Sequence, residues 1–306
     1  MIDKELYKSF DDRLPIFFRS WWLDAVCEGG EWRAEAHQTG GEYDSVFVYY
    51  LKRKFGLSYI VMPPLTQFLG DYSFIDRELG QYKPISNYYI DQLPRTAFTS
   101  ICMSHTFQYW TPYKWRGFDE TTRYSLIIND LNDLQAVYRN FEDSKQRNIR
   151  KAAKLLTINY KMTGEEFYSF FVDELHAKNQ QVRFSRTMFL KLYDACEANN
   201  AGTILQAIDS EGVTHGALFV VWDINAMYAL TYAFPDKYRN SGVGDLLMYE
   251  AMKSAAENHL AFDFEGSMIE NVEQSYRRFG SKPVGYHKIS RANWLFRIIN
   301  SVRQIY

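Results

Sequence analysis

Hydrophobic and polar positions follow an order that occurs twice, once in each half of the chain. Each time, an apolar stretch with spacings of three and four residues precedes three short stretches rich in β-branched and aromatic residues. The first spacing is typical of an amphipathic helix and the short stretches are typical of strands, so each half predicts a helix followed by a three-strand meander. The first copy covers residues 14–27, 31–37, 45–52 and 57–62, and the second covers residues 185–198, 203–208, 216–222 and 227–234. The repeated order predicts two copies of one α+β domain, each with a mixed, mostly antiparallel sheet flanked by helices.

An aromatic stretch at 109–118 separates the two copies. A predicted strand at 123–128 and a predicted helix at 131–141 follow it. We therefore expect the domains to comprise residues 1–135 and 136–306, and to pack closely because no Pro- or Ser-rich linker joins them. The aromatic stretch favours packing at this junction, with the lining of a substrate cleft as the alternative.

A basic stripe marks the next predicted helix, at 143–156. Arg147, Arg150, Lys151 and Lys154 recur at spacings that place them on one helix face. Such a stripe is usually the solvated face of a helix, and the alternative is a contact with phosphates or with an acidic partner.

The composition is that of a soluble globular protein. Of 306 residues, 46% are hydrophobic and 24% are charged, and 35 basic residues against 37 acidic ones give a net charge of −2. This balance offers no global positive field for a polyanion, so we expect no nucleic-acid partner. The chain has no apolar run long enough to span a bilayer and no signal-peptide stretch at its start, which predicts a cytoplasmic protein.

Cysteine and histidine spacing predicts neither disulfides nor a metal site. Cys27, Cys102 and Cys196 lie far apart in the sequence, and the six histidines form no HExxH or other close pair. The chain also lacks GxSxG and a cysteine beside a histidine signal, so we expect no Ser or Cys nucleophile.

The most informative segment is the loop that follows the predicted strand at 227–234. It contains Arg239, Gly242 and Gly244 and runs directly into a predicted helix at 245–258. The first turn of a helix has unpaired backbone N–H groups, glycine lets a ligand approach the backbone, and arginine adds a forked donor. This combination predicts an anion site. The pattern is neither GxGxxG nor GxxxxGK[ST], which excludes the dinucleotide and P-loop motifs.

Two motifs resemble those of GNAT-type acyl-CoA transferases. RxxGxG at 239–244, after a strand, resembles the pyrophosphate loop of that family, and YxxFG at 276–280 resembles its Tyr-x-x-x-Gly helix end, where a tyrosine faces the coenzyme sulfur. The order of loop, helix, strand at 260–265, tyrosine helix and last strand is also that of the GNAT fold. The resemblance implies two tandem GNAT-like domains with an acyl-CoA site in the second. One position departs from the family, because the frequent Asn seven residues before the tyrosine is Ile269 here.

The whole chain resembles the FemAB-like branch of this superfamily. The resemblance rests on the tandem domains, the SKQRNIRKA helix, and FDFEGS followed by YRRFG. That branch includes aminoacyltransferases that build peptidoglycan bridges and acyltransferases thought to act on cell-envelope sugars. Several Fem-type enzymes, which use aminoacyl-tRNA, carry an extra helical hairpin for which residues 156–203 leave no room. This favours acetyl-CoA or another acyl-CoA as donor, with a small-molecule, glycan or peptide acceptor.

The resemblance implies a catalytic site where the strands at 227–234 and 260–265 part. Tyr276 would protonate the leaving thiolate, and Glu265, at the end of the second strand, is the first candidate for general base. A carboxylate bound to nearby backbone is the alternative for Glu265. A backbone N–H of the first strand, near Tyr232 to Phe234, would polarise the thioester carbonyl. The residues expected to contact the coenzyme are Tyr232, Phe234, Arg239, Asn240, Ser241, Gly242, Val243 and Gly244.

The first domain is expected to lack a coenzyme loop. Residues 63–67 (PPLTQ) follow its meander where a phosphate loop would stand, and proline supplies no N–H for an anion. This domain would instead support the acceptor.

The sequence is compatible with two other functions. A Fem-type transferase would use aminoacyl-tRNA and a peptidoglycan precursor, with the basic helix at 147–154 as its RNA contact. A non-catalytic module would keep the fold and bind a glycan or a protein through the aromatic stretch at 109–118.

Overall fold

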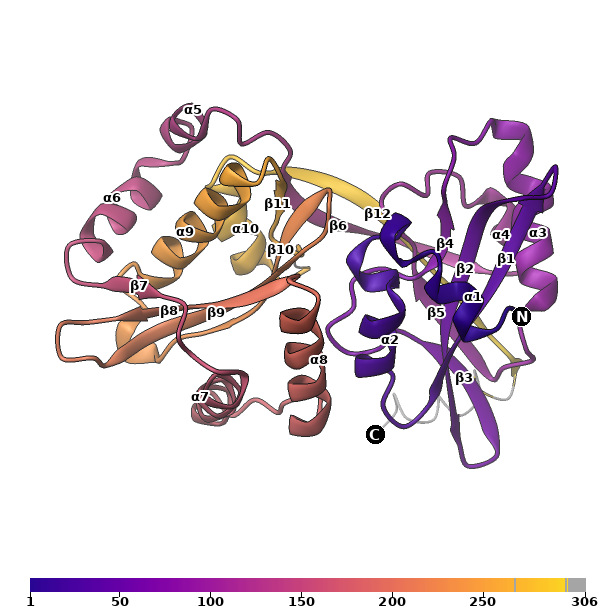
Figure 1. The fold of residues 1–306 in the computed structure, drawn as a ribbon, viewed down its shortest axis with the longest axis horizontal. Coiled ribbons are helices and arrows are strands. Elements are labelled where there is room, and N and C mark those ends of the chain that lie inside the picture. The colour runs from indigo at the N-terminus through magenta and orange to yellow at the C-terminus, as the bar shows by residue number, and fades with distance from the viewer. Residues whose placement is uncertain (267, 295, 297–306) are drawn as a thin grey trace. The chain divides into compact units, whose positions relative to one another are not determined.

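The chain divides into two compact units, and the structure, a computed structural model, describes residues 1–266, 268–294 and 296. The first unit comprises residues 1–123 and the chain from Gly285 onward, and the second comprises residues 124–284 (Figure 1). The boundary therefore lies at 123/124 rather than at residue 135, and the last strand leaves the second unit. The reason is strand pairing, because β12 (Lys282–Ala292) pairs antiparallel with β5 (Phe98–Cys102) of the first unit.

The strands of the first unit follow the order β1-β2-β3-β5-β12, and β4 also pairs with β2. The predicted meander is present as β1, β2 and β3. The elements before β5 are α1 (Lys4–Lys8), η1 (Asp11–Arg13), η2 (Ile16–Phe18), α2 (Ser20–Val26), β1 (Glu31–Thr39), β2 (Glu42–Lys54), β3 (Leu57–Val61), β4 (Gly70–Ser73) and α3 (Leu79–Gln92), and α4 (Thr111–Trp115) follows it.

Two features of this unit differ from the sequence prediction. The helix expected at 14–27 is split into η2 and α2, because Arg19 between them has an extended backbone with ψ 141°. β4 was not predicted, and it pairs with residues 45–48 of β2 while β3 pairs with residues 50–54. β3 and β4 thus lie along the same side of β2 as one interrupted strand. The loop that leads into α3 is therefore 74–78, not 63–67.

The second unit has the strand order β6-β11-β10-β9-β8-β7, in which neighbouring strands pair antiparallel except β10 with β11. Figure 1 shows α5, α6, α9 and α10 on one face of this sheet and α7 and α8 on the other. Its elements are β6 (Asp119–Ile128), α5 (Leu134–Arg139), α6 (Asp143–Ala152), β7 (Thr157–Asn159), α7 (Gly164–Ala177), α8 (Arg186–Ala198), β8 (Gly202–Ile208), β9 (Thr214–Trp222), β10 (Ala226–Ala233), η3 (Asp236–Tyr238), α9 (Val243–Glu257), β11 (Ala261–Asp263) and α10 (Glu270–Arg277). The predicted α+β class with a mostly antiparallel sheet is confirmed.

Helix α9 packs on this sheet through the face that its sequence predicts. Val243, Leu247 and Ala251 recur at spacing four, and each is at most 1% exposed. Burial of this face fixes the N-terminus of α9 at the end of β10. Among the described helices, none is both long and apolar enough to cross a membrane.

Candidate active site

The two central strands of the second unit part near their C-terminal ends. β10 and β11 pair in parallel only through residues 226–228 and 261–263, although β10 continues to Ala233. The register between β10 and β9 also shifts after Tyr228, which is the mark of a β-bulge and bends the strand. The opening predicted between these strands is therefore present, directly before the loop that contains Arg239.

Gly242 begins helix α9 in a conformation that requires glycine. It is the N-cap residue, with φ 87° and ψ 8°, and a left-handed backbone costs other residues about 1–2 kcal/mol. A Cβ at this position would also lie 2.5 Å from the backbone oxygen of Asn148 in α6 (Asp143–Ala152). The loop can therefore pass α6 this closely only because residue 242 has no side chain.

The start of α9 retains donors for an anion. The N–H of Ser241 donates to the Tyr238 oxygen at 2.9 Å, and the N–H of Val243 donates to the Ser241 hydroxyl at 3.2 Å. Within the described part of the chain, the N–H groups of Gly242, Gly244 and Asp245 have no such partner. The expected run of donors was Ser241 to Gly244. The N–H groups left for a ligand are instead those of Gly242, Gly244 and Asp245, because Ser241 and Val243 already donate within the loop.

A pocket of about 240 Å³ opens at this helix end. It brings together six of the predicted site residues: Tyr232, Phe234, Arg239, Gly242, Gly244 and Tyr276. The other four do not line it: Val243 is buried in the core, Asn240 and Ser241 belong to the loop before α9, and Glu265 follows β11. The lining residues that the sequence reasoning missed are Lys145, Asn148, Asp245, Met248, Ser275 and Phe279.

Lys145 is the most consequential of the missed residues. Its buried ammonium donates to Asp245 Oδ1 at 2.6 Å and to the Ser275 hydroxyl at 2.8 Å, so it joins α6, α9 and α10. Asn148 adds a hydrogen bond to Asp245 Oδ2 at 2.8 Å. These contacts neutralise the carboxylate at the start of α9, which would otherwise oppose an anion there. One feature of the sequence indicated that Lys145 is buried. It lies four residues before the apolar Ile149, and this spacing places both on the same face of the helix.

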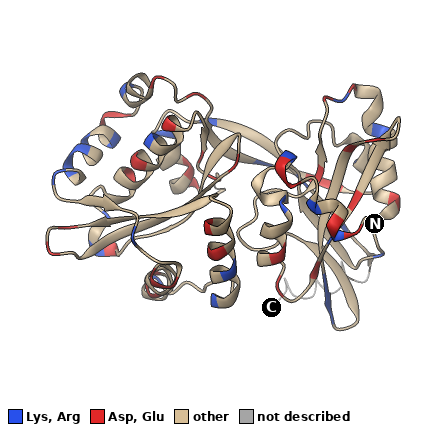
Figure 2. Ribbon diagram, viewed as in Figure 1, with Lys and Arg blue, Asp and Glu red and all other residues tan. Residues whose placement is uncertain are grey.

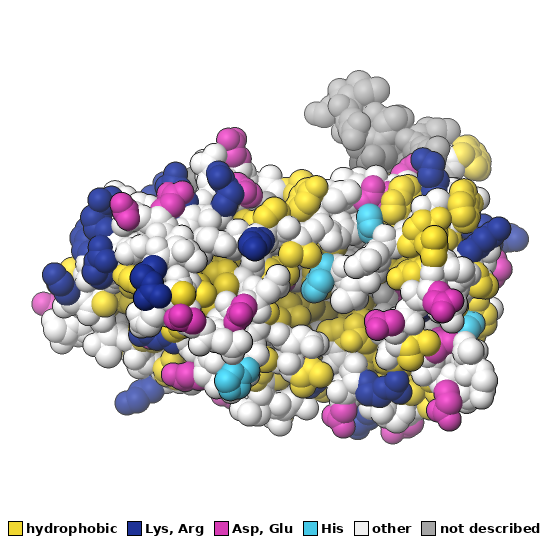
Figure 3. Space-filling view, turned by 90° about the horizontal axis from the view of Figure 1, so that it is seen from above, with side chains coloured by type: hydrophobic (Ala, Val, Ile, Leu, Met, Phe, Trp, Pro, Cys, Tyr) yellow, Lys and Arg dark blue, Asp and Glu magenta, His cyan; other side chains and the backbone are white. Residues whose placement is uncertain are grey.

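The basic stripe of α6 faces away from this pocket. Arg147, Arg150, Lys151 and Lys154 are exposed, and Lys151 donates to the Asn240 backbone oxygen at 3.0 Å. Lys and Arg positions are coloured blue along the α6 ribbon in Figure 2, and basic side chains gather at one end of the space-filling view in Figure 3. The stripe is thus a solvated helix face that also touches the loop.

Tyr276 is buried at the inner end of the pocket. It is 7% exposed, its ring stacks on that of Phe264 at 4.8 Å between centroids, and it interacts with Tyr232 on the opposite strand. Burial, together with the interactions with Tyr232 and Glu265, raises the pKa of Tyr276 well above that of a free tyrosine. The hydroxyl therefore keeps its proton at neutral pH.

Glu265 lies beside Tyr276 but does not line the pocket. Its backbone is left-handed, with φ 59°, and its N–H donates to Asp263 Oδ1 at 2.7 Å. Asp263 also accepts a hydrogen bond from the Ser125 hydroxyl. Glu265 Oε1 and Asp263 Oδ2 are both buried and have no hydrogen-bond partner among the described residues. The Glu265 residue thus donates through its backbone N–H to Asp263. The alternative prediction, a Glu265 carboxylate bound to the backbone near Gly266 and residue 267, lies partly outside the described residues.

Burial is the main cause of the raised pKa values of Asp263 and Glu265. Burial, with a smaller contribution from the nearby Asp223, raises the pKa of Asp263 to about 7, although hydrogen bonds from Ser125 and Glu265 act in the opposite direction. Burial and the neighbouring Asp263 also raise the pKa of Glu265 well above that of a free glutamate. The pair therefore binds a proton readily near neutral pH, as a group that exchanges protons must.

The described residues include no group of three or more His, Cys, Asp or Glu side chains that could hold a metal ion. Cys27, Cys102 and Cys196 are all buried and free. The site thus offers a helix end with unpaired N–H donors, a protonated tyrosine and a buried carboxylate pair as its chemical groups.

Comparison with known proteins places this arrangement in context. Residues 113–271 match the model of the acetyltransferase (GNAT) domain. No curated protein matches the chain. Among solved structures, FemX is 13% identical with a TM-score of 0.69 and covers 94% of this chain and 96% of its own.

Two further solved structures share the fold. L-PGS from Bacillus licheniformis is 12% identical with a TM-score of 0.57, covering 95% of this chain and 92% of its own. A tandem GNAT protein from the clavulanic acid biosynthesis pathway is 11% identical with a TM-score of 0.50, and the match covers 89% of this chain and 93% of that protein. At these identities the likeness is one of fold, and it confirms the predicted tandem arrangement.

Proposed function

The chain belongs to the acetyltransferase (GNAT) family, and from that premise we propose that it transfers an acyl group, in the first place acetyl, from acyl-CoA to an amine or hydroxyl. The acceptor is a small molecule or a cell-envelope-related glycan or peptide. The observation that carries the proposal is one pocket lined by a helix end that begins at a glycine, by the part of β10 beyond its pairing with β11, and by the buried Tyr276.

The fit to acyl-CoA rests on the helix end. The N–H groups of Gly242, Gly244 and Asp245 would hold the coenzyme pyrophosphate, and the exposed Arg239 side chain would add a charge-assisted contact. The Asp245 carboxylate does not oppose this, because Lys145 and Asn148 hold it. When bound, acyl-CoA supplies the activated thioester carbonyl.

Tyr276 would act as the general acid. Its pKa is raised by burial, so the hydroxyl is protonated and has a proton to give to the departing sulfur. The interaction with Tyr232 holds its position at the mouth of the parted strands. A backbone N–H of β10 near Tyr232 would polarise the carbonyl oxygen.

Glu265 would take the proton of the acceptor, through a water between its carboxylate and the pocket. The raised pKa makes it a stronger base than a free glutamate, and its electrostatic interaction with Tyr276 indicates that the two groups are neighbours. Asp263 supports this role, because it holds the Glu265 backbone in its left-handed conformation.

Calorimetric titration of acetyl-CoA into the wild type and Gly244→Val tests the pocket. A Cβ on Gly244 would meet only the Phe234 ring, at 3.5 Å, so valine fills the pocket without breaking the fold. The matched control is Gly80→Val, which changes the same second position of helix α3 (Leu79–Gln92), where a Cβ meets nothing within 4 Å. We expect binding in the wild type and the control and its loss in Gly244→Val. Absence of acetyl-CoA binding in the wild type, also with longer acyl-CoAs, would reject the proposal.

The catalytic assignments are tested by turnover once an acceptor is found. We expect Tyr276→Phe to lower kcat by about 10²- to 10⁴-fold with acetyl-CoA affinity retained. Glu265→Gln should remove the acidic limb of the pH–rate profile. Unchanged turnover in either variant removes that residue from the mechanism.

The exposed basic face of α6 favours one second candidate, a Fem-type transferase that takes aminoacyl-tRNA. Neutralisation of several phosphates makes affinity fall steeply with salt. Filter binding of aminoacyl-tRNA at 50 and 200 mM salt distinguishes the two: tight, salt-sensitive binding without acetyl-CoA binding would support the second candidate.

A further inference from the structure

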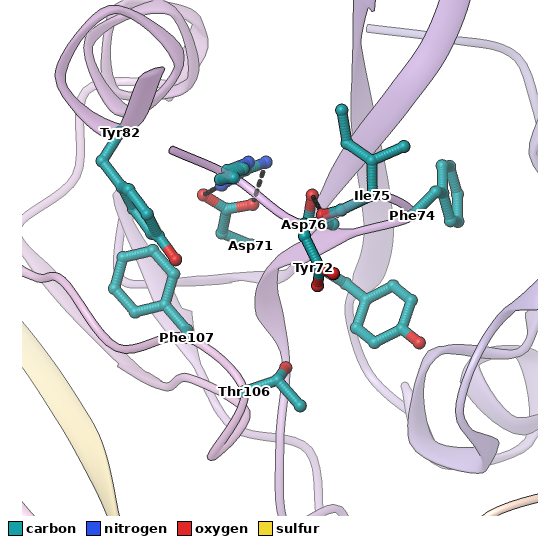
Figure 4. A pocket seen from close by; sticks show the side chains of 10 residues that line it. Asp71, Tyr72, Phe74, Ile75, Asp76, Tyr82, Thr106 and Phe107 are labelled. Atoms are coloured by element: carbon teal, nitrogen blue, oxygen red, sulfur yellow. Dashed lines mark hydrogen bonds and ion pairs between the residues drawn. The ribbon is translucent and has the colours of Figure 1, made fainter. Parts of the chain in front are cut away.

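The first unit holds a polar pocket that the proposed reaction does not use. Its volume is about 320 Å³, and it is lined by β4 (Gly70–Ser73), the loop 74–77, the first turns of α3 (Leu79–Gln92) and residues 106–107 after β5. Figure 4 shows Tyr82 and Phe107 on one side of this pocket and Tyr72, Asp76 and Phe74 toward the other. All of its lining residues belong to the first unit.

This pocket stands at the same point in the element order as the pocket of the second unit. In both units a strand ends, a loop follows, and a helix begins beside the pocket. In the second unit this strand, β10, pairs in parallel with β11, and in the first unit the parallel partner, β5, pairs with β3, the earlier piece of the interrupted strand that β4 completes. In the first unit these elements are β3 with β4, the loop 74–78 and α3; in the second they are β10, the loop 234–242 and α9. The two pockets are therefore counterparts, although their sequences differ.

The helix end of the first unit is closed to anions. Helix α3 begins with a capping box, in which Gln81 Oε1 accepts from the N–H of Glu78 at 2.8 Å. In the same box the Glu78 side chain accepts from the N–H of Gln81, and its carboxylate places a negative charge at the positive end of the helix. A phosphate would meet an occupied helix end and a negative charge.

The cationic side chain of this pocket, Arg77, is already bound to a carboxylate. Arg77 donates to both oxygens of Asp71, at 2.7 and 2.9 Å, and the two side chains are 2% and 0% exposed. The pair is neutral, so the carboxylate of Asp76 sets the net charge of the lining, two negative groups against one positive group giving −1. Asp76 is exposed and has no hydrogen bond or ion pair within the described ranges.

Aromatic rings complete the walls. The rings of Tyr82 and Phe107 lie edge to face with centroids 6.1 Å apart, and Tyr72 and Phe74 come from the strand end opposite. The Arg77 guanidinium lies 5.7 Å from the Tyr82 ring centroid, so this wall already faces one cation. Ring faces attract cations and offer no such interaction to an uncharged ligand of the same shape.

We propose that this pocket of the first unit binds an organic ammonium group, held between the Asp76 carboxylate and the aromatic rings of Tyr82 and Phe107. The ligand is a small amine or quaternary ammonium compound, or the ammonium end of a longer molecule. The site is separate from the coenzyme pocket and does not depend on the acyl transfer proposed above.

The test is a saturation-transfer difference NMR titration of the full-length chain. The probes are choline and n-butylammonium, each compared with its neutral counterpart of matched shape, 3,3-dimethylbutan-1-ol and butan-1-ol. We expect at least one ammonium probe to bind at least about fivefold more tightly than its neutral counterpart. Asp76→Asn and Tyr82→Leu should each remove most of this preference. Glu42→Gln, which removes one exposed charge at the β1–β2 turn of the same unit, should not.

Several results would overturn the proposal. These are equal binding of charged and neutral probes, a preference that survives both Asp76→Asn and Tyr82→Leu, and tighter binding of glucose or inorganic pyrophosphate in this pocket. Loss of ammonium binding in Gly244→Val would also overturn it, since the amine would then lie in the coenzyme pocket. Failure of acetyl-CoA to bind the wild type rejects only the proposed transferase reaction and leaves this result unchanged.

Discussion

Gly242 and Gly244 differ in what a side chain would meet, and alanine at the two positions should therefore have opposite effects on stability. At Gly242 the left-handed backbone costs alanine about 1–2 kcal/mol, and a Cβ 2.5 Å from the Asn148 oxygen forces a shift of α6 or of the loop. Such overpacking typically costs about 1–3 kcal/mol. We expect Gly242→Ala to lower the free energy of unfolding by about 2–5 kcal/mol in sum.

Gly244 lies inside the first turn of α9 with an ordinary helical backbone. Its Cβ would contact the Phe234 ring at 3.5 Å, a normal van der Waals distance. Alanine in a helix is favoured over glycine by about 0.5–1 kcal/mol, so Gly244→Ala should be slightly more stable than the wild type. The same methyl group enters the pocket where the coenzyme backbone contact is proposed, and we expect it to weaken acetyl-CoA binding by about tenfold or more.

Urea unfolding, together with hydrogen exchange of the α9 peptides, measures the two stabilities, because exchange reports the second unit separately. Calorimetric titration measures the affinity. A Gly242→Ala chain as stable as the wild type would refute the geometric reasoning at the helix start. A Gly244→Ala chain with higher stability and full acetyl-CoA affinity would show instead that the coenzyme does not approach this turn.

Three further outcomes follow from buried charges. Lys145→Met leaves Asp245 without its ammonium partner, and urea unfolding should show a loss of about 3 kcal/mol. Arg77→Met leaves the fully buried Asp71 unpaired and should cost about 3–5 kcal/mol by the same measurement; an unchanged midpoint in either variant would contradict the ion pair. The pKa of Asp263 is raised from 3.8 to about 7, so folding favours its protonated form and stability is lost as the pH rises from about 4 to about 7. Asp263 alone should therefore lower the wild-type stability between pH 5 and pH 8 by up to about 3 kcal/mol, and Asp263→Asn should reduce the measured fall by about this amount, with the share of Glu265 remaining.

The sequence predicted the strands and helices that have a clear hydrophobic period. β8 to β10 and helix α9 lie where alternation and the spacing-four face of Val243, Leu247 and Ala251 indicate. β4 was missed because four residues, Gly70 to Ser73, carry no alternation, and its pairing with β2 is a tertiary contact. The helix at 14–27 was overextended because the extended backbone of Arg19 leaves no mark in the apolar pattern.

The candidate site was predictable only where it is local in sequence. The loop from Arg239 to Gly244 is read from glycine and arginine spacing, which acts through the backbone of the same segment. Lys145 and Asn148 come from a helix about a hundred residues earlier, so their place beside Asp245 depends on how α6 packs against α9. Of the carboxylate pair, only Glu265 was predicted, because the burial of Asp263 and its hydrogen bond from the Glu265 N–H depend on the tertiary fold.

The two units show how few residues decide what a shared arrangement of strand, loop and helix can bind. A capping box and a bound anion compete for the same first-turn N–H groups, so a helix end can serve one or the other. Helix α3 is closed by Glu78 and Gln81, whereas α9 begins with Gly242 and retains its donors. Asp245 of one unit is neutralised by Lys145, whereas Asp76 of the other has no such partner among the described residues. The two proposals, an anion in one pocket and a cation in the other, therefore depend on the few residues at each helix start rather than on the shared arrangement of strand, loop and helix.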